Sequence, residues 1–114
     1  MMRVVASAKR AFSTVSIRPL WMLRYNYVDG MLEKRDPFRK DHLSHIERLA
    51  KAGDDSDVKM IMAGAFADPV DGAAFVLEAA NAQQVEAFAK KDPYVINNLV
   101  TKFDVRVWNV VEFK

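Results

Sequence analysis

The chain has 114 residues, a formal net charge of +2 and no cysteine. This length supports one domain rather than two, and a charge so close to zero argues against a nucleic-acid partner. The lack of cysteine excludes disulfides, thiolate metal ligands and a cysteine nucleophile. No apolar run approaches the roughly 18 residues that a membrane-spanning helix needs, so we expect a soluble protein without a membrane segment.

Residues 1–18 are basic, rich in serine and threonine, and free of acidic side chains. An amphipathic N-terminus of this composition is typical of a mitochondrial transit peptide, which predicts a location in the mitochondrial matrix. The stretch RAFS at residues 10–13 is similar to the arginine-based cleavage sites of matrix processing peptidases. The alternative is a short disordered tail on a cytoplasmic protein. In either case we expect residues 19–114 to form a single domain.

The first predicted elements are a strand and a long amphipathic helix. Residues 20–28 are rich in aromatic and branched side chains that alternate with polar ones, which indicates a strand. Residues 33–53 carry apolar side chains at helical spacing. Within them, Asp36 before Pro37 is a helix start signal and Gly53 is a stop signal.

Two further strands are predicted at residues 58–66 and 73–80. The segment between them is rich in aspartate, proline and glycine, so the two strands should pair as an antiparallel hairpin. Gly64 lies inside the first of these strands. A glycine there indicates either a β-bulge or the close approach of backbone or ligand.

The rest of the chain predicts two helices and a last strand. Asn81, with Gln84 three residues later, predicts the N-cap of a second helix. Asp92 before Pro93 repeats the start signal and predicts a short third helix. Residues 104–113 alternate as a strand. The order β-α-β-β-α-β is typical of a ferredoxin-like α+β fold with a four-stranded antiparallel sheet.

Both faces of most predicted strands carry apolar side chains, for example Met60 and Met62 against Ile61 and Ala63. Helices on one side of such a sheet would leave the other side exposed to water. We therefore expect a homodimer in which two open sheet faces pack together as an α+β barrel. A pocket for a small molecule is possible between the layers.

His42 and His45, the two histidines of the chain, both lie on the first predicted helix. The helical repeat places His42 inside the apolar stripe and His45 on its border. A histidine side chain titrates close to physiological pH and can serve in acid–base catalysis. The alternative is a core histidine whose nitrogens have found partners. Both interpretations stay open for His42, whereas His45 is assigned the structural one.

Taken together, these motifs resemble the YciI-like (YCII-related) family of small dimeric α+β-barrel proteins. The resemblance covers about residues 21–113 and rests on four pieces in matching order. They are EKR at 33–35, RKDHL at 39–43, AG at 63–64 and DPYV at 92–95.

The resemblance implies a pocket that contains a catalytic His–Asp pair, carried here by His42 and Asp92. The candidate substrate-binding residues are Arg39, Arg35, Tyr94 and Gly64. Each has a simpler alternative, because an aspartate before proline caps a helix, a tyrosine can simply pack, and an arginine can be solvated at the surface.

The resemblance also implies a reaction class. Some members of the family resemble dehydrochlorinases of aromatic catabolism, so we expect a small lyase- or isomerase-type enzyme that moves a proton on a small polar or anionic substrate. The alternative is a non-catalytic dimeric module that binds a ligand or stabilises a partner. No cofactor and no metal are expected, because the chain has no phosphate-binding glycine loop and two histidines alone supply too few metal ligands.

Overall fold

The computed structural model describes residues 15–50 and 57–113. In chain order the elements are β2 (Val15–Tyr27), α1 (Met31–Lys34), α2 (Asp36–Ala50), β3 (Lys59–Ala65), β4 (Gly72–Glu78), α3 (Ala82–Lys90), α4 (Pro93–Ile96) and β5 (Val100–Phe113). The four strands form one antiparallel sheet in the order β3-β4-β2-β5. This order confirms the predicted ferredoxin-like α+β fold and the predicted hairpin between β3 and β4.

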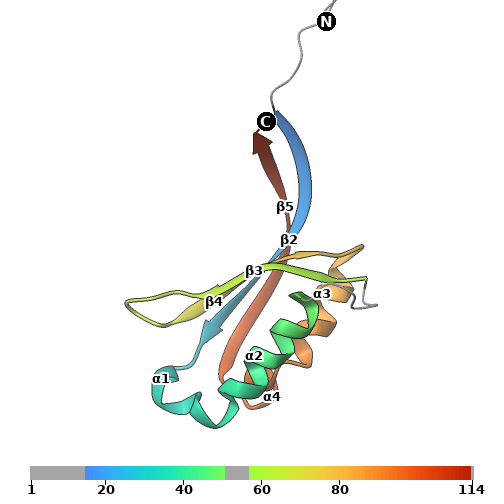
Figure 1. Ribbon diagram of the computed structural model, residues 1–114. Coiled ribbons are helices and arrows are strands. Elements are labelled where there is room, and N and C mark those ends of the chain that lie inside the picture. Colours follow the sequence, from blue (N-terminus) through green and yellow to red (C-terminus); the bar gives the residue numbers. More distant parts are fainter. Residues whose placement is uncertain (1–14, 51–56, 114) are drawn as a thin grey trace, which may run out of the picture.

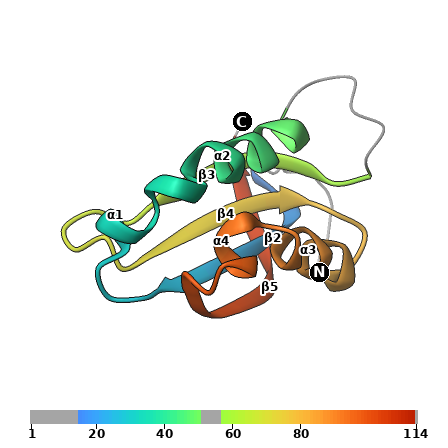
Figure 2. The same cartoon turned by 90° about the horizontal axis from the view of Figure 1, so that it is seen from below.

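All the helices lie on one face of the sheet (Figure 1, Figure 2). Helix α2 packs over β3, whereas α3 packs over β2 and β5. The core lies between these two layers and is built from side chains that alternate inward along the strands, such as Leu23, Phe75 and Leu77, together with Val85 of α3. The inward-facing side chains of the strands and the apolar side chains of the helices therefore form one common core.

The outer strands are longer than their sequence pattern predicts. β2 begins at Val15 rather than at residue 20, and β5 begins at Val100 rather than at residue 104. Residues 15–18, which we predicted to belong to the N-terminal tail, pair in register with the last residues of β5. Arg18 supports this longer strand, because its guanidinium pairs across the strands with Glu78 and Glu112. Paired in this way, β2 and β5 project beyond the helices (Figure 1).

The helix signals are largely confirmed. The side chain of Asn81 accepts a hydrogen bond from Gln84 N, as the predicted cap requires, whereas Gln84 Oε1 accepts from Ala80 N, one residue before the N-cap. Helix α2 begins at Asp36 itself, directly after the short helix α1 that the sequence pattern did not predict. The predicted stop signal at Gly53 and the predicted cleavage site at residues 10–13 lie outside the described residues.

Of the two alternatives predicted for Gly64, a β-bulge or the close approach of backbone or ligand, the bulge is found elsewhere. The register of β3 shifts between Met60 and Met62, whereas Gly64 pairs regularly with Ala74. No atom lies within 4 Å of the position that a Cβ of Gly64 would occupy. Because side chains alternate along a strand, this empty position shares the face of Met62 and lies on the side of the sheet opposite the helices.

The sheet face opposite the helices is open in the single chain. Met62, Val76 and Met22 are register partners on this face, and Trp108 lies opposite Leu20. Met62 is 62% exposed and Trp108 is 45% exposed. The open face thus has the apolar character that the sequence predicted for a dimer interface, and the homodimer itself stays a prediction. No helix in the described part of the chain is both long and apolar enough to cross a membrane.

Candidate functional site

His42 and Asp92 meet beneath the helices. His42 comes from the buried side of α2, and Asp92 is the residue that caps α4. His42 Nδ1 lies 2.8 Å from Asp92 Oδ1, and both side chains are buried, that of Asp92 completely. The two residues are 50 positions apart in sequence, so the fold brings together the two predicted catalytic residues.

The Asp92 carboxylate accepts three hydrogen bonds. Oδ1 accepts from His42 Nδ1 and, at 2.9 Å, from the backbone N–H of Tyr94, while Oδ2 accepts from the Tyr25 hydroxyl at 2.8 Å. The sequence left open whether this residue caps a helix or partners a histidine. Geometrically it does both at once, because one oxygen can accept two donors.

This arrangement determines which nitrogen of His42 carries the proton. An ionised carboxylate can only accept, so this contact places a hydrogen on Nδ1, and in the neutral imidazole Nε2 then carries the lone pair. Within the described residues, Nε2 has no hydrogen-bond partner. His42 therefore has one nitrogen that is anchored and one that is free to exchange a proton.

Two aromatic rings hold the imidazole in place. The Tyr94 ring is stacked on the His42 ring, with centroids 3.6 Å apart and planes inclined by 8°. Phe75 meets His42 edge-on at 6.5 Å. Because the Asp92 contact fixes one ring atom and the stack fixes the plane, the direction of Nε2 is also fixed.

A cavity of about 300 Å³ opens beside this pair. Its lining includes Arg35, Arg39, His42, Gly64 and Tyr94, so five of the six predicted site residues share one cavity, and the sixth, Asp92, lies behind His42. The other lining residues are Tyr27, Leu43, Ile46, Ala63, Ala65, Ala73 and Phe75. Leu43, one of the apolar side chains at helical spacing in residues 33–53, lines the cavity and is 46% exposed.

Two buried polar atoms at this cavity have no hydrogen-bond partner among the described residues. They are the Tyr94 hydroxyl and Arg35 Nε. A buried donor without a partner costs roughly 1–3 kcal/mol, and most buried polar groups in folded proteins have a partner. Both residues belong to the set predicted from the sequence.

The tyrosines around the carboxylate are held in their neutral form. Burial, followed by the negative charge of Asp92, raises the pKa of Tyr25 well above its usual range. Burial also raises the pKa of Tyr27, to about 12, although Arg35 and Arg39 oppose the shift. Both phenols therefore keep a hydrogen to donate at neutral pH.

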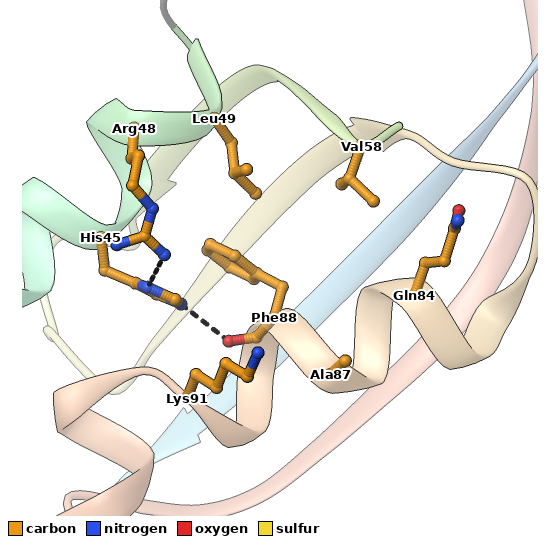
Figure 3. A pocket seen from close by; sticks show the side chains of 8 residues that line it. All are labelled: His45, Arg48, Leu49, Val58, Gln84, Ala87, Phe88 and Lys91. Carbon is orange, nitrogen blue, oxygen red and sulfur yellow. Dashed lines mark hydrogen bonds between the residues drawn. The ribbon is translucent and has the colours of Figure 1, made fainter. Parts of the chain in front are cut away.

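His45 has the structural role that the sequence assigned to it. Nε2 donates to the carbonyl oxygen of Phe88 at 2.8 Å, and Nδ1 accepts from the Arg48 guanidinium at 3.2 Å (Figure 3). The ring also stacks on Phe88. With both nitrogens engaged, His45 ties α2 to the end of α3. It lines a separate cavity of about 310 Å³, with Arg48, Leu49, Val58, Gln84, Ala87, Phe88 and Lys91 (Figure 3).

The described residues contain no cluster of three histidine, cysteine, aspartate or glutamate side chains that could hold a metal ion. His42 and His45 do not converge, because their bonded nitrogens point to Asp92 and to Phe88 respectively.

Sequence reasoning missed two polar contributors to the site, Tyr25 and Tyr27. Their alternation in residues 20–28 correctly placed both on one strand face. That pattern could not show that the Tyr25 hydroxyl reaches Asp92, 67 positions away. The available signal was the hydroxyl of an inward-facing tyrosine. A buried tyrosine hydroxyl usually has a hydrogen-bond partner, so a polar residue nearby could have been expected.

Comparisons with known proteins agree with this fold. Residues 20–109 match the model of the YCII-related domain. Among solved structures, 5-chloro-2-hydroxyhydroquinone dehydrochlorinase (TftG) from Burkholderia phenoliruptrix AC1100, in complex with 2,5-dihydroxybenzoquinone, matches with a TM-score of 0.64 and 21% identity. The match covers 78% of this chain and 92% of the other.

Protein SO0527 from Shewanella oneidensis also matches, with a TM-score of 0.49 and 17% identity, over 85% of this chain and 97% of the other. A search of curated proteins finds no match.

Proposed function

We propose that this chain, which belongs to the YCII-related domain family, is a small-molecule enzyme that transfers protons through its His42–Asp92 pair. The single observation that carries the proposal is the anchored imidazole. Nδ1 is bonded to a buried carboxylate, and Nε2 is free beside a cavity. General acid–base catalysis needs a group of this kind, positioned before the substrate arrives.

In the proposed reaction His42 Nε2 accepts a proton from the substrate and later returns it. Asp92 keeps the other nitrogen protonated and stabilises the imidazolium that forms, as the aspartate of a catalytic triad does. Tyr25, bonded to the second carboxylate oxygen, holds Asp92 in place. The chain has no cysteine, so a proton-transfer reaction of the lyase or isomerase type is favoured over a route through a cysteine nucleophile.

The substrate proposed is a small polar or anionic molecule. Arg39, Arg35 and Tyr94 would bind its polar groups, and the part of the cavity along Ala63, Gly64 and Ala65 would accept its body. TftG is named as a dehydrochlorinase, and loss of hydrogen chloride removes a proton and a chloride ion from the substrate. The proposed chemistry for this chain is of that general type, with its own substrate to be identified.

Deuterium exchange tests the proposal. The full chain would be incubated in D₂O with a panel of small carboxylates, lactones and hydroxyaromatics, and C–H exchange would be followed by NMR. We expect exchange in at least one compound, and His42→Gln should reduce its rate by about 10²–10⁴-fold. His45→Gln is the control, because it alters the other buried histidine of α2 without touching the cavity beside His42. Equal rates in the wild type and His42→Gln would refute the proposal.

A second candidate function is binding without turnover. The unpartnered Tyr94 hydroxyl and Arg35 Nε favour it, since both are explained by a bound ligand alone. In that case members of the panel would shift the melting temperature, and no compound would exchange. The same experiment therefore separates the two functions.

Two further parts of the proposal concern assembly and location. The open sheet face with Met62 and Trp108 is the proposed homodimer interface, since an apolar sheet face of this kind is stabilised by a second layer. The acid-free N-terminus is the proposed mitochondrial address. A fluorescent fusion of the full chain, compared with one that lacks residues 1–12, would test the address.

A further inference from the structure

We infer that the ligand of the His42 cavity is a small monoanion whose charged head group only accepts hydrogen bonds, attached to an apolar body about the size of one ring. A carboxylate or an enolate has such a head group. The inference names the substrate class and rests on the proposed function for the step that follows binding. Binding of this ligand depends only on the chemistry of the cavity lining.

Apart from His42, whose Nε2 is the proposed proton acceptor, the polar side chains that line the cavity can offer hydrogens to a ligand. Arg35 and Arg39 only donate. Tyr27 keeps its proton, since burial raises its pKa to about 12, and Tyr94 adds a second phenol. No carboxylate side chain lines the cavity in the described part of the chain. The nearby Asp92 is fully buried and already accepts three hydrogen bonds.

Two of these donors are buried and unpartnered. The Tyr94 side chain is 1% exposed, and neither its hydroxyl nor Arg35 Nε has a partner among the described residues. Burial without a partner is costly for a donor, and an acceptor oxygen in the cavity would remove that cost. Two arginines with no carboxylate in the lining add a positive potential. A cationic ligand would meet repulsion here, and a neutral ligand would gain less from the two charges than an anion would.

The other side of the cavity is apolar. The apolar lining consists of Leu43 and Ile46 from α2, the small residues Ala63 and Ala65 of β3, and Phe75. A volume of about 300 Å³ is at the lower end of the range for ligand pockets. It suits a compact apolar body rather than a long chain or a nucleotide.

This division of the lining suggests where the reacting bond lies. With the head group at the arginines, His42 Nε2 would meet a C–H bond next to the charged or carbonyl group. The C–H bond breaks, an N–H bond forms at Nε2, and the electron pair moves onto the substrate oxygen. Return of the proton to another carbon completes an isomerisation, and loss of a leaving group with its electron pair completes an elimination. Neither outcome requires an oxidant or a reductant.

Calorimetric titration of the full chain with benzoate, benzamide and benzylamine tests the inference, because the three probes differ mainly in the head group. We expect benzoate to bind at least tenfold more tightly than benzamide, a difference of about 1.4 kcal/mol, and benzylamine not to bind. Arg39→Gln and Tyr94→Phe should each weaken benzoate at least threefold. Lys102→Gln is the matched control, since it removes one positive charge from an exposed position on β5.

The inference is overturned if benzamide or benzylamine binds as tightly as benzoate, or if Lys102→Gln weakens benzoate as much as Arg39→Gln does. Failure of the proposed function would look different. Anions would then bind selectively, but no member of the deuterium-exchange panel would exchange. Conversely, His42-dependent exchange in neutral compounds alone would support the proposed function and overturn the anion inference.

Discussion

The ring of Tyr94 lies face to face on the imidazole of His42, with centroids 3.6 Å apart. The same residue donates its backbone N–H to Asp92, the carboxylate that bonds His42 Nδ1. One turn of chain, Asp92 to Tyr94, therefore supplies both the group that anchors the imidazole and the surface that fixes its plane. The cap of helix α4 and the candidate catalytic pair are thus a single structure, and a change in one affects the other.

Removing the Tyr94 hydroxyl should stabilise the protein. Because this buried hydroxyl has no partner in the described chain, Tyr94→Phe should keep the stack and remove an unsatisfied group. We expect the free energy of unfolding to rise by up to about 1 kcal/mol, measured by urea denaturation without ligand. Binding of benzoate should weaken in the same variant. This combination is typical of residues that are retained for function at a cost in stability.

Removing the Tyr25 hydroxyl should have the opposite effect. Tyr25 is as deeply buried as Tyr94, but its hydroxyl donates to a carboxylate oxygen at 2.8 Å. Hydrogen bonds to charged groups contribute roughly 1.5–3 kcal/mol, so Tyr25→Phe should lower the free energy of unfolding by that order. The same urea titration measures it. A stabilised Tyr25→Phe would contradict the hydrogen-bond assignment, and a destabilised Tyr94→Phe would show that its hydroxyl has an unseen partner.

The fold was largely predictable because its signals are local. The start signals at Asn81 and at Asp92 act within four residues, and both appear in the structure as side-chain caps. The features of the fold that the sequence pattern did not predict depend on contacts with distant residues. Residues 15–18 become a strand only because β5 extends far enough to pair with them. The shifted register near Met60 likewise depends on how β3 meets β4.

The candidate site was also predictable in part, and the rest of it depends on contacts between distant residues. The resemblance to the family correctly grouped Arg35, Arg39 and Gly64 around one cavity. The helical repeat placed His42 on the buried face, but it could not show that one ring nitrogen would be bonded and the other free. Nor could it show that Tyr94 stacks on His42 and leaves its hydroxyl unpartnered. These features depend on side-chain directions in three separate elements.

Stability should fall in alkaline solution. The pKa of Tyr27 is raised by burial to about 12, and that of Tyr25 is raised further, whereas an unfolded tyrosine titrates near pH 10. The folded state therefore holds protons that the unfolded state releases, and stability is lost as pH rises above about 10. Urea midpoints at pH 8, 10 and 11 measure the loss. In Tyr27→Phe the urea midpoint should fall less between pH 8 and pH 11. If it fell as much as in the wild type, Tyr27 would not be the cause of the loss.

A charge on the open sheet face should break the proposed dimer. Trp108 is 45% exposed on this face in the single chain, and a lysine there would be buried without a partner in a sheet-to-sheet interface. We expect Trp108→Lys to sediment as a monomer at concentrations where the wild type is a dimer. Ile96→Lys is the control, because Ile96 is 61% exposed but lies on α4, on the helix side. A monomeric wild type would refute the proposed interface.

Asp92→Asn separates the two geometric roles of Asp92. Asparagine is as good an N-cap as aspartate, so its oxygen can still accept from the Tyr94 N–H, and the helix should lose little from the cap. The amide, however, cannot support an imidazolium at His42. Deuterium exchange should therefore fall by roughly 10²–10⁴-fold, while circular dichroism keeps the wild-type helix signal.

Asp92→Ala completes the comparison, because alanine neither caps the helix nor bonds His42. Leaving Tyr25 and His42 without their shared acceptor should lower the free energy of unfolding by several kcal/mol, far more than Asp92→Asn does. If Asp92→Asn retained the full exchange rate, the carboxylate would serve only to cap α4 and to hold Tyr25. His42 would then act without an ionised partner, and the proposed mechanism would have to be abandoned.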